Sequence, residues 1–152
     1  MTLRDQINEA LKSAMLERDA TAVATVRLIL AALKDRDISE RSRGNPEGLN
    51  DAEILELLQA MIKQRGESMR LYAQGGRPEL AKQEADEVEV IKRFLPEQMS
   101  PDAVATAVDQ AIDETAASSL KDIGRVMGVL RQRFPGRMNF AKAGEMVRQR
   151  LG

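Results

Sequence analysis

Apolar residues recur every three or four positions through most of this chain, which is the spacing of one face of an α-helix. Thr2 and Asp19 each precede such a run, and both are residue types that cap the starts of helices. The first stripe consists of Leu3, Ile7, Leu11 and Met15, and the second of Val23, Val26, Ile29, Leu30 and Leu33. The pattern predicts two amphipathic helices, and the charged tail of the second, residues 34–43, is expected to run into solvent.

Two more apolar stripes follow in the first two thirds of the chain. Asn50 and Glu53 have the spacing of a capping box before one of them, and Pro78 suits the first position of the next helix. Gly75-Gly76 is expected to supply the left-handed residue that ends the earlier helix. The stripes consist of Ile54, Leu57, Leu58, Met61, Ile62, Met69 and Tyr72, and of Ala81, Ala85, Val88, Ile91 and Leu95. Four helices with short links predict an antiparallel unit.

A signal that stops one helix and starts another follows this unit. Pro96 cannot continue a helix, because it lacks an N–H and its ring clashes with the preceding turn. Ser100 is a good cap, and Pro101 suits the first helical position. Beyond it, Ser119-Leu-Lys-Asp122 and Asn139 precede further stripes. The three C-terminal stripes are Val104, Val108, Ala111 and Ile112; Ile123, Val126, Met127, Leu130 and Phe134; and Phe140, Ala143, Val147 and Leu151.

These patterns predict an all-α protein of two helical subdomains. We expect a four-helix N-terminal unit over residues 1–96 and a smaller three-helix C-terminal unit over residues 97–152. Neither Cys nor His occurs, which excludes thiol chemistry, disulfides and a Ser-His-Asp triad. No phosphate-binding glycine motif, signal peptide or membrane-length apolar run is recognisable. We therefore expect a soluble, cytoplasmic protein with no cofactor, no metal site and no membrane partner.

Charged residues in the N-terminal unit offer two weak candidates for a site. Glu84 and Glu87 lie one turn apart in an acidic run and have the spacing to share a Mg²⁺ ion, although such runs are usually ion-paired surfaces. Lys63 and Arg65 are expected to pair with that run, and Lys63 also has the spacing to pair with Glu67.

The second candidate lies at the start of the fourth helix. There Arg77 and the free amides suit an anion. A plain turn between helices explains the same residues and is the preferred interpretation.

Basic residues gather near the C-terminus. From Ser119 to Gly152 there are eight basic and two acidic residues, a net charge of +6. The candidate RNA-binding residues are Lys121, Arg125, Arg131, Arg133 and Arg137. Lys121 and Arg125 fall opposite the predicted core stripe, where they suit phosphates. A solubilising surface explains the charge equally well, because no stacking aromatics accompany it.

Gly124 and Gly128 lie one turn apart inside the sixth predicted helix. Each costs about 1 kcal/mol relative to alanine, so a close approach by another backbone is expected there. The fifth or seventh helix is the preferred neighbour, and a partner molecule is the alternative.

Five segments together resemble the YqeY family over nearly the whole chain. They are Val26-Arg27-Leu28 through Ile38, Lys63-Gln64-Arg65 with Glu67-Ser68, Gly75-Gly76-Arg77-Pro78-Glu79-Leu80-Ala81, Phe94-Leu95-Pro96-Glu97-Gln98 and Asp122-Ile123-Gly124-Arg125-Val126-Met127-Gly128. A related domain forms the C-terminal tail of the B subunit of the tRNA-dependent amidotransferase, where it contacts tRNA. The resemblance implies an all-α, two-subdomain bacterial protein whose C-terminal unit is similar to that tail.

The resemblance implies a partner more clearly than a reaction. It implies tRNA, or an enzyme that charges or amidates tRNA, as the partner. The family also carries the label of a carbon–nitrogen ligase with glutamine as amide donor, but this chain has no thiol to attack glutamine and no recognisable phosphate loop. We therefore expect a tRNA-associated accessory module that is not catalytic alone, with the ligase and a protein-interaction adaptor as alternatives. The segment Arg131–Asn139 departs from the family's Lys/Gly-rich turn, so the tRNA contacts carry over better to Lys121 and Arg125.

Overall fold

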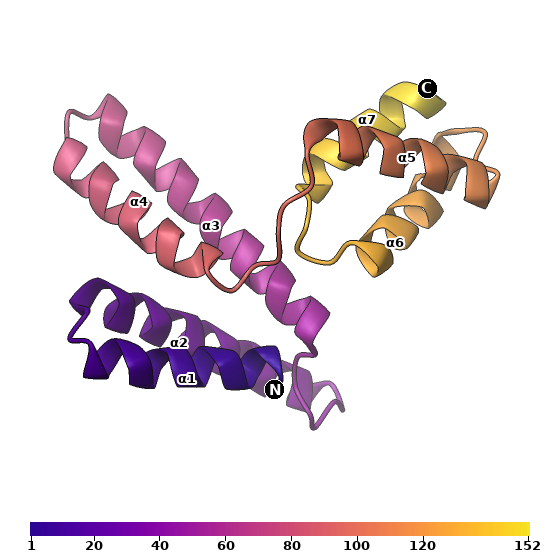
Figure 1. The fold of residues 1–152 in the computed structure, drawn as a ribbon. Helices are drawn as coiled ribbons and strands as arrows, with labels where there is room; N and C mark the ends of the chain where they lie inside the picture. Colours follow the sequence, from indigo (N-terminus) through magenta and orange to yellow (C-terminus); the bar gives the residue numbers. More distant parts are fainter. The chain divides into compact units, whose positions relative to one another are not determined.

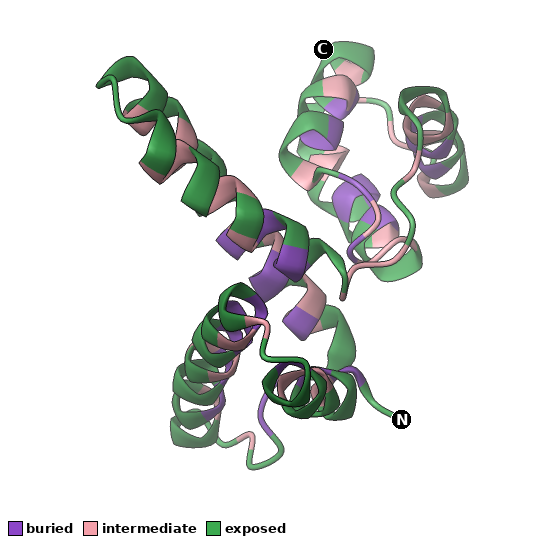
Figure 2. Ribbon diagram, turned by 60° about the vertical axis from the view of Figure 1, so that its left-hand side comes forward, coloured by how far each residue is buried: buried purple, intermediate pink, exposed green.

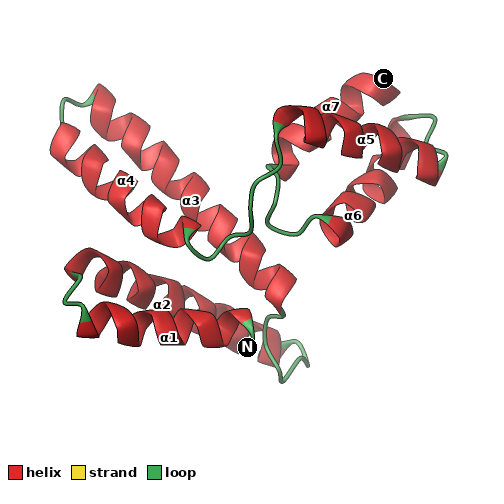
Figure 3. Cartoon of the chain, in the orientation of Figure 1, coloured by secondary structure: helices red, strands yellow, loops and turns green.

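The computed structural model describes residues 1–152 and consists of seven α-helices, a single short 3₁₀ turn and no strand (Figures 1 and 3). The elements are α1 (Leu3–Leu16), α2 (Ala20–Ser42), α3 (Asp51–Gln74), α4 (Pro78–Lys92), α5 (Pro101–Thr115), η1 (Leu120–Asp122), α6 (Ile123–Arg133) and α7 (Phe140–Leu151). The predicted all-α class is confirmed. The chain divides into two compact units, Met1–Leu95 with α1 to α4 and Pro96–Gly152 with the remaining elements.

The helix starts follow the capping residues read from the sequence. Thr2, Asp19, Asn50, Ser100 and Asn139 each accept a hydrogen bond from the backbone N–H three residues further on, at 2.9–3.1 Å. This side-chain acceptor satisfies one of the N–H groups that the first turn of a helix leaves without a partner. The local signals therefore set the starts of five of the seven α-helices.

The helix starting at Pro78 has no side-chain cap. Its position is set by the proline at its first residue and by the turn before it, where Gly76 has φ +72°. A positive φ costs glycine little, so Gly76 is the left-handed residue predicted for this turn.

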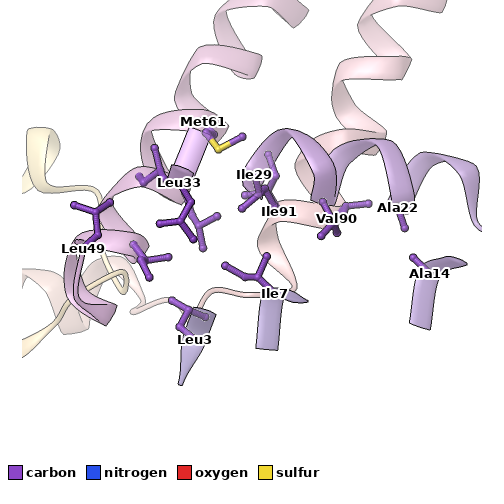
Figure 4. Close-up of a cluster of buried hydrophobic side chains, with 14 residues drawn as sticks. Leu3, Ile7, Ala14, Ala22, Ile29, Leu33, Leu49, Met61, Val90 and Ile91 are labelled. Atoms are coloured by element: carbon purple, nitrogen blue, oxygen red, sulfur yellow. The ribbon is translucent and has the colours of Figure 1, made fainter. Parts of the chain in front are cut away.

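The core of the first unit gathers one face from each of its four helices (Figures 2 and 4). Each helix contributes one completely buried side chain: Ile7, Ile29, Leu58 and Ile91. α1 and α2 lie side by side, as do α3 and α4 (Figure 1). Beyond Met61 the α3–α4 hairpin is only partly buried, so the predicted inward residues there, such as Met69 and Tyr72, are intermediate rather than buried.

The predicted core stripe of α1 is wrong at its last position. Met15 is 52% exposed, and Ala14 takes its place in the core at 5%. A stripe that advances four residues at a time drifts by about 40° per step, because an α-helix has 3.6 residues per turn. By Met15 the drift from Leu3 has reached about 120°, whereas Ala14 lies within about 20° of Leu3.

The charged tail of α2 does not run wholly into solvent, which corrects a second expectation. Asp37 is only 7% exposed, and its carboxylate faces Arg4 of α1. Arg4 Nη1 donates to Asp37 Oδ2 at 2.5 Å, and Arg4 Nη2 donates to the carbonyl of Leu49 at 2.9 Å. The Leu49 N–H in turn donates to Asp37 Oδ1 at 2.9 Å. This clamp joins the start of α1, the end of α2 and the loop before α3.

The core of the second unit is made by α5, α6 and α7 together with Met138 from the loop before α7. Val108, Val126, Leu130 and Val147 are completely buried within it. The segment that enters the unit is held against the same loop, since the Met99 N–H donates to the Arg137 carbonyl at 2.9 Å and Gln98 Nε2 donates to the Gly136 carbonyl at 2.7 Å.

Candidate nucleic-acid interface

One side of α6 is open to solvent along its whole length. Val126, Met127 and Leu130 face the core on the other side. We call the open side the α6 outer face. It consists of Lys121 from the preceding η1 turn with Gly124, Arg125, Gly128 and Arg131, all of them exposed. Spacings of three, four and seven residues place these positions on one face of a helix. The face therefore presents three cations around two residues that have no side chain.

The start of this helical segment is fixed by Asp122. Its Oδ2 accepts hydrogen bonds from the N–H groups of Ser118 at 2.9 Å and Ser119 at 3.3 Å. The Ser118 N–H, followed by Arg125 and then the Ser119 N–H, lowers the pKa of the Asp122 carboxyl, because these donors stabilise its ionised form. The predicted capping function of Asp122 is thereby present.

Lys121 and Arg125, the two residues favoured from the sequence, differ in their contacts. Lys121 is exposed and forms no ion pair. Arg125 Nη2 donates to Asp122 Oδ1 at 2.7 Å, and its Nη1 donates to the Thr115 carbonyl at the end of α5 at 3.1 Å. Its side chain is nevertheless 60% exposed. Lys121 is thus free to meet a ligand, whereas Arg125 would share its guanidinium with the protein.

The other three candidates also divide by their contacts. The guanidinium of Arg131 lies 5.6 Å from the centre of the Phe140 ring, an arrangement that suits a cation–π contact. Arg133 forms an ion pair with Glu114 of α5. Arg137 is half-buried, and its Nε donates to the Glu97 carbonyl at 3.1 Å. Arg133 and Arg137 therefore bind other parts of their own unit, while Arg131 remains on the α6 outer face.

The charge balance of the whole second unit is smaller than that of its last segment. Residues 96–152 contain eight basic and seven acidic residues, so the net charge is +1. Two acids on α5, Asp109 and Glu114, pair with Arg150 and Arg133. Five basic residues form no ion pair: Lys121 and Arg131 on the outer face, Lys142 and Arg148 on α7, and Arg137, whose guanidinium donates to a backbone carbonyl.

The expectation that a neighbouring helix packs on Gly124 and Gly128 is wrong. A Cβ atom built at either position would meet nothing within 4 Å. Packing against a neighbouring helix occurs instead at the buried Gly144 of α7, where a Cβ would lie 3.9 Å from Met127 Sδ, an ordinary van der Waals distance. Gly144 lies next to Ala143 in the apolar stripe that continues to Val147. A small residue in such a stripe is the sequence signal that could have identified this packing contact.

Two of the charged candidates of the first unit, Arg77 and Glu87, are engaged in ion pairs, whereas Glu84 and Lys63 form none. Arg77 Nε lies 2.6 Å from Glu79 Oε1, so the guanidinium meant for an anion already has a carboxylate partner. Glu87 Oε2 lies 2.9 Å from Arg65 Nε, which fits the predicted pairing of Arg65 with the acidic run. The pair predicted between Lys63 and Glu67 is replaced by one between Glu67 and Arg70 at 3.1 Å. No group of three potential metal ligands occurs in the chain.

The helices and the exposed basic face define an all-α protein with no helix both long and apolar enough to cross a bilayer. The chain matches the family described as Yqey-like protein over residues 4–151, and it belongs to this family.

Similar curated proteins come from yeasts. "Altered inheritance of mitochondria protein 41, mitochondrial" of Clavispora lusitaniae is 29% identical over 74% of this chain and 59% of its own length. The proteins of the same name from Meyerozyma guilliermondii and Eremothecium gossypii are each 28% identical, over 90% and 59% of this chain. The chain spans 64% and 46% of those two relatives, so all three are longer than the part they share with it.

Proposed function

We propose that this chain is an accessory module that associates with tRNA through the second unit, at the α6 outer face. The observation that carries the proposal is the combination of three exposed cations with two uncovered glycines on α6 and the turn before it. The resemblance of the Asp122–Gly128 segment to the amidotransferase tail supplies the class of ligand. Phosphates are the groups that such a face suits best, because Lys and Arg neutralise them and release counterions.

The two glycines give this face a shape as well as a charge. A residue without Cβ lets a ligand backbone come closer to the helix than any other residue does. Lys121 and Arg125 border the glycines on one side, and Arg131 lies one turn beyond Gly128. A phosphodiester strand that lies across Gly124 and Gly128 therefore has a cation within reach at both ends.

The ion pair between Arg125 and Asp122 does not prevent such binding. The Arg125 side chain is 60% exposed, although that of Asp122 is only 20% exposed, and a pair with one solvent-exposed partner contributes little net stability. If a phosphate displaces Asp122, the Arg125 guanidinium still has a charged partner. Arg125 is accordingly a secondary contact, and Lys121 and Arg131 are the primary ones.

Base recognition is expected to be slight. The chain has no Trp and a single Tyr, Tyr72, in the first unit. Sequence-specific RNA recognition usually stacks unpaired bases on aromatic rings. Phe134 and Phe140, the aromatic residues of the second unit, are partly buried against its core. Binding through the α6 outer face is therefore expected to follow phosphate number and salt rather than sequence.

An accessory role also suits the residues better than catalysis does. Amide transfer from glutamine requires a nucleophile to release ammonia, and the chain has neither a thiol nor a histidine to activate a hydroxyl. We expect no ammonia release from glutamine by the pure protein. Glutaminase turnover that co-elutes with the protein in size-exclusion chromatography would support the ligase alternative instead.

The direct test is a titration of bulk tRNA at several salt concentrations with Lys121→Glu/Arg131→Glu. The matched control is Lys142→Glu/Arg148→Glu, which makes the same change in net charge with exposed residues of α7 in the same unit. Each lost phosphate contact is expected to reduce the slope of log affinity against log salt by roughly 0.7 to 0.9. Equal losses in both variants, or no binding by the wild type at low salt, would contradict the assignment to this face.

A further inference from the structure

The solvent side of α2 carries a regular row of cations in the first unit. Arg27, Lys34 and Arg41 follow one another at intervals of seven residues, about 10.5 Å along the helix axis. All three are exposed, and none forms an ion pair, whereas nearby Arg43 pairs with Glu40. We call these residues the α2 cation row. Arg27 and Lys34 have no charged partner in the first unit, and Arg41 acts there only at a distance, as a minor contributor to the lowered pKa of Asp37.

An apolar seam runs beside the α2 cation row. It consists of Ala24, Leu28, Ala31 and Ile38. Leu28 is 45% exposed and Ile38 is 49% exposed, while the two alanines, Ala24 and Ala31, have small side chains that let another helix approach. Steps of four and three residues follow the seam of a coiled coil, and the cations occupy a flanking position of each seven-residue repeat. The seam position between Ala31 and Ile38 is the exposed Asp35, so the apolar seam is interrupted there. α2 therefore offers a seam to a second helix although its opposite side is already buried in the core.

A groove between α1 and α2 adjoins this seam. Its volume is about 260 Å³, and Leu30 and Leu33 contribute to its apolar lining. Lys34, Ile38 and Arg41 line it from α2. Arg4 also lines it, but its charge is balanced by the hydrogen-bonded carboxylate of Asp37. The net charge around the groove is therefore positive, and it comes from two members of the α2 cation row.

We propose that this surface binds an acidic amphipathic helix of a partner protein. The apolar side chains of that helix would lie on the α2 seam and at the mouth of the groove, and its carboxylates would face Arg27, Lys34 and Arg41. A seven-residue interval is two turns of a helix, so acidic residues repeated every seven positions on the partner meet the row in register. Binding of lipid headgroups or free phosphates would not require cations at a fixed seven-residue interval.

A second copy of this chain fits the surface less well. Its most acidic helix is α4, where Glu79 and Asp86 lie seven residues apart, but the next position of that series is Arg93, and no series of three acids at this interval occurs in the helix. We therefore infer that the ligand of this surface is a different protein, whose helix has unpaired acidic residues.

The test uses the full chain and a labelled three-heptad peptide with leucine at the two core positions of each heptad and glutamate at the flanking ones. Fluorescence anisotropy at about 0.15 M salt measures its binding, because there charges more than about 8 Å apart are largely screened. Arg27→Glu/Lys34→Glu/Arg41→Glu is expected to weaken binding by at least about tenfold, since three attractions become repulsions. Ile38→Ser is expected to weaken it by roughly tenfold through lost apolar burial.

The matched control is Arg18→Glu/Arg36→Glu/Lys63→Glu, which changes the net charge equally with exposed residues outside the α2 cation row. It is expected to bind the peptide within about threefold of the wild type, as is Lys121→Glu/Arg131→Glu. Circular dichroism checks that each variant is folded.

Three results would overturn the proposal: no binding of the glutamate peptide by the wild type, equal binding by the row variant, or equal binding of a peptide with the same composition in permuted order. Vesicles of phosphatidylserine and phosphatidylcholine, and bulk tRNA, are titrated in parallel. If either requires the α2 cation row while the peptide does not, the face is a lipid or RNA surface and the proposal is wrong.

Discussion

The two units use their charged residues in different ways. In the first unit, charges join elements from inside: Asp37 is 7% exposed, and the Arg65–Glu87 pair has side chains only 12% and 18% exposed. In the second unit, the ion pairs that join helices lie nearer the surface: the side chains are 48% and 49% exposed in Arg133–Glu114 and 34% and 58% exposed in Arg150–Asp109. Breaking a half-buried pair is costly in free energy, because the charge left behind is poorly solvated. In an exposed pair water solvates each charge, so either partner can be exchanged for another ion at little cost. The cations of the second unit are therefore the better placed to exchange a protein partner for a phosphate.

The largest effect is expected from removing the Arg4–Asp37 clamp. Asp37→Ala leaves a half-buried guanidinium and the Leu49 N–H without their acceptor, so the free energy of unfolding is expected to fall by about 2–3 kcal/mol. The control is Asp35→Ala, two residues earlier on the exposed side of α2, with an expected change below about 0.5 kcal/mol. Urea unfolding followed by circular dichroism measures both. Similar values for the two variants would mean that the clamp is no more important than a surface charge.

Glycine substitutions are expected to act in opposite directions in the two units. Gly48 has φ +77°, and a Cβ there would collide with the Asp37 side chain, so Gly48→Ala is expected to cost about 1–3 kcal/mol. Gly124→Ala and Gly128→Ala place a Cβ in open space inside a helix and are each expected to stabilise it by about 1 kcal/mol.

The same two alanines separate stability from binding. If a ligand backbone lies on the α6 outer face, Gly124→Ala/Gly128→Ala is expected to weaken tRNA binding while it raises the thermal midpoint. Thermal unfolding and a tRNA titration on one preparation measure both properties. An unchanged affinity would show that the glycines are not part of the interface.

A smaller effect is expected from acid. The hydrogen bond from Arg4, assisted by the Leu49 N–H, holds the pKa of Asp37 below its ordinary value near 4. A carboxyl group with a lowered pKa stabilises the folded state above its unfolded pKa, and that contribution is lost as the pH falls through the folded pKa. The difference in stability between the wild type and Asp37→Asn is therefore expected to be full at pH 6 and to shrink below pH 4. Unfolding measured from pH 6 to pH 3 tests this, and a difference independent of pH would contradict it.

Local features of this fold were predictable from the sequence, and contacts between distant segments were not. Thr2, Asp19 and Asn50 were recognisable because a cap depends on residues within one turn. The exchange of Met15 for Ala14 was also within reach of a strict 3.6-residue period. Nothing in the sequence pairs Arg4 with Asp37, since 33 residues separate them and only the packing of α1 on α2 brings them together.

The candidate site shows the same division. The exposure of Lys121 and Arg125 followed from the helical period, because they lie opposite the core stripe. The contacts of Arg133 with Glu114 on α5 and of Arg137 with Glu97 depend on tertiary packing. The net charge of +6 after Ser119 was a correct count, but it left out the acids of α5 that face those arginines.

The most direct test of the account compares one exposed basic face from each unit against the same tRNA. Bulk tRNA is titrated at low salt with the wild type, with Lys121→Glu/Arg131→Glu and with Arg27→Glu/Lys34→Glu/Arg41→Glu. The account predicts salt-sensitive binding by the wild type, a clear loss in the α6 variant and retention in the α2 variant, although the α2 variant carries the larger change in net charge. Binding that falls in proportion to net charge, whichever face is altered, would contradict a tRNA interface on α6.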